Sequence, residues 1–238
     1  MDTFGEERTF WLNTERPVEN FDYHLWTPKE PWGIANVQGV PIAELMAKFI
    51  RPVAEQAQRG NWLYDLVVLD SISVAEHDNV SYIEANTGKK DGRQIWGDQF
   101  ADMFILLRTL QAGTRQKNTV GKYVGVGANV IITARARQEM IPNVTNPDGT
   151  PKFFSKPDLR GYWGDHIAHP FNIVAYLEYK GASRKIHLVQ TARYVAKCDW
   201  EKDLKGNDVD AGEWDEGFRA FPQVLEACGI EKEVLSLK

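Results

Sequence analysis

The chain has 238 residues, of which 43% are hydrophobic and 26% charged, and a formal net charge of −5 at pH 7. This length allows one sizeable core or one domain with a small appendage, and the negative balance does not favour non-specific binding to nucleic acid. With two cysteines, no basic-then-apolar leader and no apolar run near the roughly 20 residues of a membrane helix, we expect a cytoplasmic protein without a disulfide framework or membrane association.

The first segments of the chain alternate between strand-like and helix-like patterns. Residues 8–14 form a short apolar run of strand formers. Residues 24–41 contain three prolines and two glycines, and we expect an ordered loop there. From Ile42 to Val53 the apolar residues recur at helical spacing, which predicts a helix that Pro52 bends and Gly60 stops.

The middle of the chain contains two continuous apolar runs. Leu66 to Leu69 is typical of a strand buried on both faces of a parallel sheet, and residues 128–134 predict a second such strand. Between them, the polar and glycine-containing residues 76–93 predict a loop, and Ile95 to Leu110 predict a long amphipathic helix. Residues 137–165 contain turn signals without clear periodicity and predict a long loop.

The last third predicts a β-hairpin and then a more polar extension. Phe171 to Tyr179 and Lys185 to Thr191 are strand-like and are joined by a short polar connection. The C-terminal residues are acidic, with a short helix expected from Phe221 to Cys228. Alternating strands and helices predict an α/β fold with a mainly parallel sheet. We place the core domain at residues 1–200 and the extension at residues 201–238.

Asp70 directly follows the apolar strand that ends at Leu69. In open α/β sheets, ligands bind at the carboxyl ends of the strands. A carboxylate there can hold a metal-bound water beside a nucleotide phosphate, with Ser71 sharing the hydrogen bonds, as in the Walker B strand of P-loop ATPases. The alternative is an aspartate that only forms a turn or caps a helix.

Glu15 and Arg135 end two further predicted strands. A glutamate at this edge could orient and deprotonate an attacking water, and an arginine could sense or stabilise a phosphate. The alternatives are a surface glutamate before a turn and a solvated or acid-paired arginine. Polar or charged residues thus end three apolar strands. Such a set of three is less likely to arise by chance than any one of them alone.

The segments WLNTERP, DLVVLDS and NVIITARAR, in this order, resemble RecA-like ATPase cores. The closest resemblance is to the small RecA-like, AAA-type nucleotide-binding ATPases of bacteriophages that act in recombination, and it runs from about residue 8 to about residue 200. It implies a P-loop NTPase core with a mainly parallel sheet flanked by helices and a C-terminal antiparallel hairpin. It also implies ATP and Mg²⁺ as ligands and a ring or filament of identical subunits.

The resemblance assigns a role to each residue of the predicted site. Glu15 matches the catalytic glutamate, and Asp70 with Ser71 matches Walker B, so that Asp70 would hold Mg²⁺ through water. Arg135 occupies the sensor region, where RecA itself has a glutamine. Arg193 lies where a cation of a RecA-like neighbour reaches the nucleotide across a subunit interface.

The phosphate-binding pattern of this family, G-x-x-x-x-G-K-[ST], does not occur in the sequence. The Gly-Lys pairs at residues 88–89 and 121–122 lack both the spacing and the Ser or Thr that should follow. In the family the P-loop precedes the strand that here ends before Glu15, so we expect the first strand and the P-loop to be missing. A misplaced start or split gene, a partner chain that supplies the P-loop, and a degenerate relative all remain open.

Residues 150–163 interleave cations with aromatic rings and include Lys152, Phe154, Lys156 and Arg160. This pattern suits single-stranded DNA, because lysines meet backbone phosphates while bases stack on rings. The resemblance places the segment where RecA faces DNA. The alternative is a loop that folds its aromatic side chains onto the body of the protein.

Taken together, the sequence predicts a phage-type RecA-like ATP-binding protein that acts in DNA recombination or single-strand annealing in a bacterial host cell. The alternatives are a non-catalytic DNA- or protein-binding relative that has lost the P-loop and a helicase-type core of the same superfamily. Asp165, His166 and His169 give only a weak metal signal, because two histidines three residues apart lack a convincing third ligand.

Overall fold

The computed structural model describes residues 6–16, 24–88, 92–111, 125–168, 171–180, 183–188, 195–198 and 209–210. The chain divides into two compact units, Met1–Ala134 and Arg135–Lys238, and each is described by itself. The expected boundary at residue 200 lies outside the described residues and stays a prediction.

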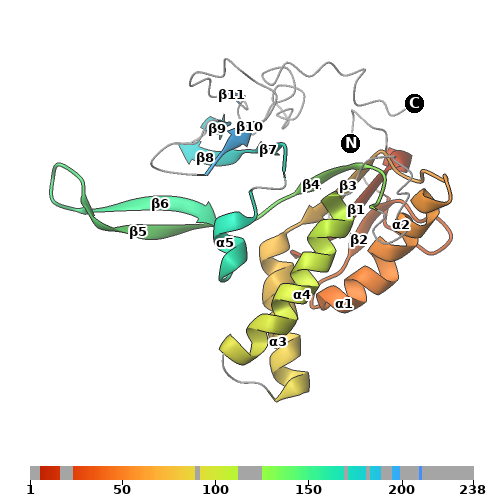
Figure 1. Ribbon diagram of the computed structural model, residues 1–238. Coiled ribbons are helices and arrows are strands. Elements are labelled where there is room, and N and C mark those ends of the chain that lie inside the picture. The colour runs from red at the N-terminus through yellow and green to blue at the C-terminus, as the bar shows by residue number, and fades with distance from the viewer. Residues whose placement is uncertain are drawn as a thin grey trace. The chain divides into compact units, whose positions relative to one another are not determined.

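A four-stranded parallel sheet forms the first unit, in the order β2-β1-β3-β4 (Figure 1). The strands are β1 (Thr9–Asn13), β2 (Gly33–Asn36), β3 (Leu66–Asp70) and β4 (Asn129–Ile132). In register, Leu12 of β1 lies between Ala35 of β2 and Leu69 of β3, and Leu69 pairs in turn with Ile132 of β4. The predicted parallel sheet is confirmed, and the two continuous apolar runs that suggested it form the neighbouring strands β3 and β4.

β2 lies where the sequence predicts only a loop, so that prediction was wrong for Gly33–Asn36. Gly33 has φ +84°, and a Cβ at this position would collide with the backbone carbonyl of His24. Only glycine permits both this conformation and this close approach. The glycine that the strand requires, together with the surrounding prolines, therefore made this segment resemble a loop in sequence.

β4 is less buried than its apolar sequence predicts. All of its residues are half-buried, whereas Leu12 and Leu69 on the central strands are fully buried. Among the described strands, β4 stands at one end of the sheet order, which leaves it paired with β3 alone. Its apolar run reflects strand propensity and partial cover rather than burial on both faces.

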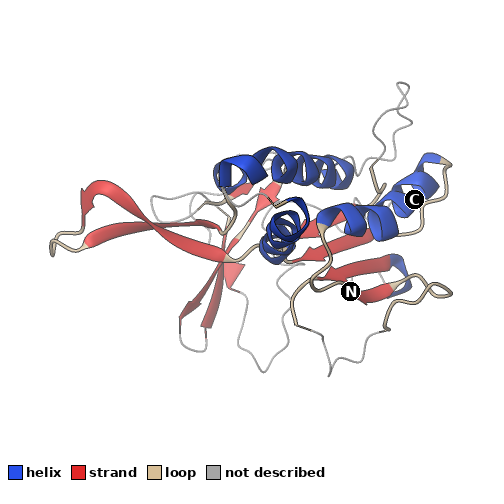
Figure 2. Ribbon diagram, turned by 90° about the horizontal axis from the view of Figure 1, so that it is seen from below, coloured by secondary structure: helices blue, strands red, loops and turns tan. Residues whose placement is uncertain are grey.

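Two helical segments follow β2 and β3, and Figure 2 shows the helices of this unit together on one side of the sheet. The first segment consists of α1 (Ile42–Leu45), a π-helical turn η2 (Met46–Ile50) and α2 (Arg51–Gln58). The second consists of α3 (Ile72–Thr87) and α4 (Gly92–Gln111). A separate 3-10 turn, η1 (Glu6–Arg8), precedes β1. Pro52 lies in the first turn of α2, where the helix type changes, and Gly60 follows the helix with φ +82°. The predicted helices from Ile42 and from Ile95 are confirmed.

The core of this unit is apolar and comes from the sheet and from all of these helical segments. Its largest fully buried side chains are Phe10, Leu12, Ile42, Leu45, Ile50, Leu69, Ile72, Met103, Leu106, Leu107 and Leu110. Burying a side chain of this size contributes about 1.5–3 kcal/mol, so the sheet edge described below rests on a well-packed base.

α3 occupies most of the segment that the sequence predicts as a loop, and that prediction was wrong. Some of its polar residues are buried and bond to neighbouring helices. Asn79, 1% exposed, accepts a hydrogen bond from the Ile42 N–H at 3.0 Å and donates one to Asp102 at 3.1 Å, and Gln99 donates to the buried Glu76. A helix that buries polar side chains lacks the apolar stripe on which sequence patterns depend.

The second unit begins with a long antiparallel hairpin, β5 (Ala136–Thr145) and β6 (Pro151–Pro157). Here too the sequence predicts a loop, and the structure corrects it. The strands are joined by a tight turn, in which the Asn146 N–H donates to the Thr150 carbonyl at 2.8 Å and Gly149 has φ +83°. Most residues of β5 are exposed, so no alternation of buried and exposed side chains marked the strand.

The other elements that the structure describes in the second unit are short. They are α5 (Tyr162–His166), β7 (Ile173–Val174), β8 (Tyr176–Lys180), β9 (Ser183–His187), β10 (Lys197–Cys198) and β11 (Val209–Asp210). β8 and β9 form the predicted hairpin, which is confirmed. The helix expected from Phe221 to Cys228 lies outside the described residues.

Candidate functional site

The carboxyl ends of β1, β3 and β4 meet at one edge of the parallel sheet. Backbone hydrogen bonds continue past the strand ends: the Thr14 N–H donates to the Asp70 carbonyl at 2.7 Å, and the Thr133 N–H donates to the Leu69 carbonyl at 3.0 Å. The Ile72 N–H, at the start of α3, donates to the Thr133 carbonyl at 2.9 Å. Polar residues that are 57 and 63 positions apart in sequence are therefore fixed side by side.

Thr14 joins β1 to the end of β3 through its side chain. Its hydroxyl donates to the Ser71 carbonyl at 2.8 Å and accepts from the Ser71 N–H at 2.7 Å. Thr14 is 2% exposed and Ser71 is 3% exposed, so both groups depend on each other for hydrogen bonding. The peptide bond between Asp70 and Ser71 is cis.

The side chain of Ser71 contacts Glu15, the predicted catalytic glutamate. Its hydroxyl donates to Oε1 of Glu15 at 2.8 Å and accepts from the Val74 N–H at 3.4 Å, which makes it the N-cap of α3. Glu15 is half-buried, and its own N–H donates to Oδ1 of Asn13 at 3.1 Å. Both the backbone and the carboxylate of Glu15 are thus held by buried polar residues.

Asn13 extends this edge toward β2. It is 1% exposed, and its side-chain amide donates to Oδ1 of Asn36 at 2.8 Å and to the Arg16 carbonyl at 3.0 Å. The Val37 N–H donates to the Asn13 carbonyl at 2.8 Å. Asn13 was not among the predicted site residues. The sequence signal that could have identified it is an amide side chain at the end of an apolar strand.

Asp70 lies at the centre of the edge and is half-buried. Its Oδ1 accepts a hydrogen bond from the hydroxyl of Thr133. Within the described part of the chain, no hydrogen bond reaches its Oδ2. A carboxylate with one oxygen fixed and the other available suits a water of a hydrated Mg²⁺, because Mg²⁺ prefers oxygen ligands and usually retains several waters. The donor set therefore fits the ion that the sequence predicts.

Thr133, rather than Arg135, is the first polar residue after β4 and touches Asp70. The predicted strand ran to Ala134, but β4 ends at Ile132, which moves the strand end back by two residues. Arg135 is exposed and begins the second unit, so its place relative to this edge is not described. Its proposed sensor role stays a prediction.

The hairpin residues predicted to bind DNA have different surroundings. Lys156 lies between two carboxylates, Asp165 at 2.7 Å and Glu139, and its side chain is 10% exposed. The hydrogen bonds that the Lys156 ammonium donates to Asp165 and to Glu139 raise the pKa of Lys156, and the bond to Asp165 has the larger effect. Lys152 and Phe154 are half-buried and Arg160 is exposed. Lys156 therefore carries a structural ion pair, which reduces its capacity to meet a phosphate.

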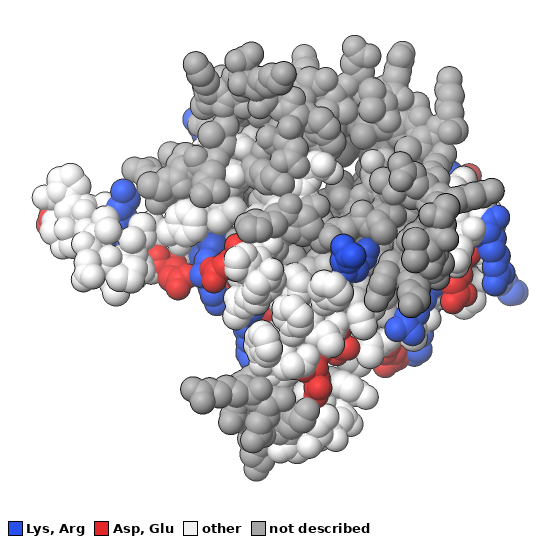
Figure 3. Space-filling model, viewed as in Figure 1, with Lys and Arg blue, Asp and Glu red and all other residues white. Residues whose placement is uncertain are grey.

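The charge distribution of the hairpin agrees with this reading. On the face shown in Figure 3, the projecting hairpin is mostly uncharged, and basic and acidic groups lie next to each other near its base. Near that base the Arg137 guanidinium also approaches the Asp158 carboxylate, at 3.8 Å. The hairpin presents mixed charge and exposed Met140 and Phe153 rather than a continuous basic patch.

Arg193 and His169 lie outside the described residues. Among the residues that the structure describes, no three His, Cys, Asp or Glu side chains gather into a metal-binding group. Trp26 packs edge-to-face on Phe49 at 5.2 Å, and Trp32 stacks on His24 at 3.8 Å, so both tryptophans serve packing.

Comparison with known proteins identifies the fold family. The model of the family described as "AAA domain" matches residues 29–199, which include Asp70, Ser71 and Thr133, while Glu15 and β1 lie before the match. No curated protein and no solved structure is significantly similar. None of the described helices is long and apolar enough to cross a membrane. Because the matched segment covers most of the chain, the protein belongs to the AAA domain family of P-loop NTPases, which are nucleotide-binding proteins.

Proposed function

We propose that this chain binds Mg²⁺ and ATP at the carboxyl edge of β1, β3 and β4, and that this edge is the water-activating half of an ATPase site. The observation that carries the proposal is the linkage of two carboxylates on neighbouring strands: Ser71 is bonded to Glu15 and directly follows Asp70. In P-loop ATPases, one acidic residue positions the metal and a second polar or acidic residue positions the attacking water.

The chemistry of each residue follows from its contacts. Asp70, oriented by the Thr133 hydroxyl, would accept a hydrogen bond from a metal-bound water. Glu15, held by Ser71, would accept a proton from the attacking water. Thr133 itself is exposed at the end of β4 and could donate to a phosphate oxygen if it released Asp70. Bound Mg²⁺ would supply charge neutralisation for the phosphates.

The phosphates need a cradle that the printed sequence does not contain, since the G-x-x-x-x-G-K-[ST] pattern is absent. We propose that a P-loop from outside the printed residues completes the site. This chain alone should then bind Mg²⁺–ATP weakly and hydrolyse it at or near the background rate, with or without single-stranded DNA. Robust hydrolysis by the purified chain would contradict the need for a second phosphate-binding element.

Nucleotide binding can be tested with a fluorescent ATP analogue titrated with and without Mg²⁺. We expect binding that depends on Mg²⁺ and that weakens about tenfold or more in Asp70→Asn, because this change removes the charge at the metal-facing carboxylate. Asp98→Asn, which neutralises an exposed carboxylate on α4, is the matched control. Binding that ignores Mg²⁺ or survives Asp70→Asn, or no binding at all, would refute the proposal for this chain.

We also propose a role on DNA, in recombination or single-strand annealing, as the phage-type ATPases that the sequence resembles have, and assembly into a ring or filament. The support is the β5–β6 hairpin, which carries Lys152 and Phe154, and the exposed Arg160 shortly after β6. Contacts from these residues would combine ionic and stacking interactions with a single strand. Lys156 is assigned a smaller part, because two carboxylates already engage its ammonium group.

DNA binding can be tested by fluorescence anisotropy with a labelled single-stranded oligonucleotide. Lys152→Ala combined with Arg160→Ala should weaken binding and reduce its salt dependence. A complex with fewer phosphate contacts releases fewer counterions when it forms. Lys29→Ala, at an exposed position of the first unit, is the control. Equal affinity and equal salt slope for the double variant and the control would argue against the hairpin as the DNA site.

A second candidate is a non-catalytic relative that keeps the AAA fold as a binding module. The absence of the P-loop pattern from the sequence is the observation that favours it. It predicts no Mg²⁺-dependent nucleotide binding even when candidate partner chains are added. The nucleotide titration therefore separates the two candidates directly.

A further inference from the structure

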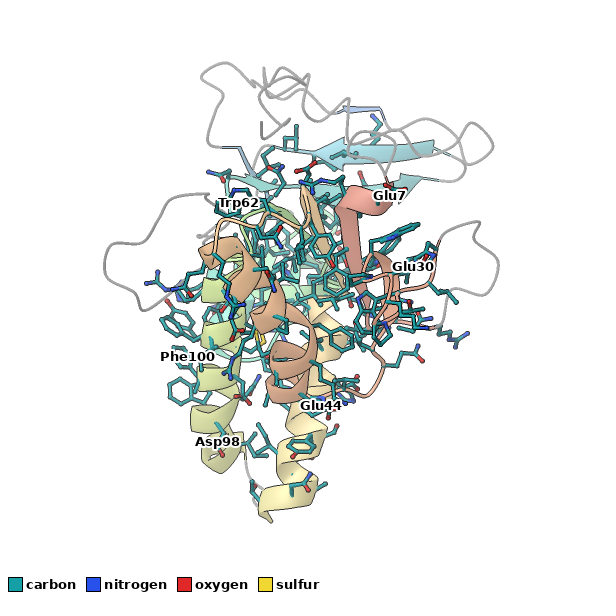
Figure 4. All side chains as sticks on the ribbon, turned by 90° about the vertical axis from the view of Figure 1, so that its right-hand side faces the viewer. Glu7, Glu30, Glu44, Trp62, Asp98 and Phe100 are labelled. Carbon is teal, nitrogen blue, oxygen red and sulfur yellow. The ribbon has the colours of Figure 1, made fainter. Side chains whose placement is uncertain are left out.

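α4 carries a stripe of aromatic side chains on its outward face. Trp96, Phe100 and Phe104 recur every four residues, with ring centroids 5.3 Å and 6.2 Å apart, and the guanidinium of Arg108 lies 5.7 Å from the centre of the Phe104 ring. Trp96 is 50% exposed and Phe104 is 40% exposed. Figure 4 shows Phe100 pointing outward from the helix. We call these four residues the α4 stripe.

The α4 side chains that enter the core are a different set from those of the stripe. The core side chains are Ile95, Met103, Leu106, Leu107 and Leu110, each at most 3% exposed. A helix that buries one face usually presents a polar face to water, and contiguous exposed apolar surface usually marks an interaction site. The four-residue spacing in the stripe gives the second face a continuous line of rings rather than a scattered set.

Small side chains beside the stripe leave room for another helix. Gly97 and Ala101 are exposed on adjoining turns, and Ile105, 38% exposed, continues their line. A Cβ built on Gly97 would meet no atom within 4 Å. A neighbouring helix could therefore approach the backbone of α4 closely along this line, as small residues allow in other helix pairs.

The order of residues in the stripe is self-complementary. If a second copy of α4 lies antiparallel to the first about a two-fold axis near Asp102, Phe100 faces the partner's Phe104. The same axis places Trp96 against the partner's Arg108. Aromatic pairs and a cation over a tryptophan ring are both favourable, and a two-fold interface requires such reciprocal contacts.

We propose that the α4 stripe is the two-fold interface of a homodimer of this chain. In a second copy the partner's Arg108 would lie over Trp96 and the partner's Phe104 against Phe100. A nucleic-acid strand fits less well, because the rings already stack on one another and the exposed Asp98 on the same helix would repel phosphates. The interface is reciprocal, in contrast to the head-to-tail contacts of a ring, and does not depend on nucleotide.

The oligomeric state of the full chain tests the proposal. Sedimentation velocity between about 1 and 100 μM should show a concentration-dependent dimer, and Phe100→Glu should weaken dimerisation about 100-fold or more, because it places a charge at the centre of the interface. Tyr82→Glu replaces an aromatic residue that is 48% exposed on α3 and should dimerise as the wild type does. A monomeric wild type, or equal dimerisation of Phe100→Glu, would overturn the proposal.

Crosslinking tests the geometry without relying on a disruptive variant. In a background with Cys198→Ser and Cys228→Ser, a chain with Phe100→Cys mixed with a tagged chain carrying Phe104→Cys should form a mixed disulfide on mild oxidation. A mixture of Phe100→Cys with Tyr82→Cys should not. Circular dichroism would verify that each variant is folded. A dimeric sample without the crosslink between positions 100 and 104 would rule out this interface.

Discussion

The hydroxyl of Ser71 donates a hydrogen bond to Oε1 of Glu15 at 2.8 Å while it accepts one from the Val74 N–H at 3.4 Å. One oxygen atom therefore links the end of β1 to the first turn of α3. Together with the reciprocal bonds of Thr14, it holds Glu15 and Asp70 in a fixed relation at the sheet edge. The same contacts that support the fold orient the proposed catalytic carboxylate.

Replacing Ser71 with Ala should lower the free energy of unfolding by about 1–2 kcal/mol, because α3 loses its N-cap and Glu15 loses a partner. Urea denaturation measures the change. Ser81→Ala, at an exposed position of α3, should change stability by no more than about 0.5 kcal/mol. Equal stabilities of the two variants would show that the Ser71 hydroxyl does not support the helix.

Alanine substitutions at two glycines with the same backbone conformation can distinguish the cost of backbone strain from the cost of a steric clash. Gly127 and Gly39 both have φ +66°, but a Cβ on Gly127 would lie 2.6 Å from ring carbons of Trp62, whereas one on Gly39 would meet nothing within 4 Å. Gly39→Ala should cost about 1 kcal/mol, from the left-handed conformation alone. Gly127→Ala should cost a further 1–3 kcal/mol, roughly, from overpacking. Thermal unfolding of both variants compares the two costs, and equal losses would mean that Trp62 moves aside freely.

Burial raises the pKa of Tyr64 to about 12 from an ordinary value near 10. The phenol, which donates to the Pro31 carbonyl, is thus kept protonated in the folded state. Its contribution to stability is complete below about pH 10 and is lost as pH rises toward 12. The stability difference between wild type and Tyr64→Phe should therefore shrink across this range, as measured by urea unfolding at several pH values. Tyr82→Phe is the control, and its free energy of unfolding should change with pH in parallel with that of the wild type.

The ion pair at the base of the hairpin predicts a pH dependence of opposite sense. A hydrogen bond from Lys156 lowers the pKa of Asp165, and the nearby charges of His166 and Arg137 add to the effect. A depressed carboxyl pKa stabilises the folded state above about pH 4 and ceases to do so as pH falls through the folded value. Asp165→Asn should therefore be less stable than the wild type near neutrality.

This difference should disappear in acid. Urea unfolding of wild type and Asp165→Asn at a series of pH values from about 7 to about 3 would reveal the convergence. Glu84→Gln, at an exposed position of α3, provides the control for a general loss of negative charge. Parallel curves for wild type and Asp165→Asn would show that Lys156 does not hold the carboxylate in the folded protein.

Elements that depend on their own residues were predicted well. β3 contains a continuous apolar run, β1 is a short run of strand formers, and the buried apolar residues of α4 recur at helical spacing, so the local sequence predicts each element. The position of Asp70 at a strand end follows from the same pattern. The AAA domain match supports the fold class that these elements suggested.

Elements that depend on distant partners were not predicted from the sequence. α3 buries Asn79 against Ile42 and Asp102, and its polar sequence therefore resembled a loop. Most residues of β5 are exposed, so this strand lacks an alternation of buried and exposed side chains. β2 relies on a glycine whose need is evident only beside the His24 carbonyl.

The sequence by itself determined which strands end in polar residues, because a run of apolar side chains and its end are properties of neighbouring residues. Only the tertiary structure decided which of those residues meet. Parallel register sets Asn13 opposite Asp70, and the bonds beyond it tie Ser71 to Glu15 and Thr133 to Asp70. Such contacts join positions that are far apart in the chain, and the position of each residue along its strand fixes them.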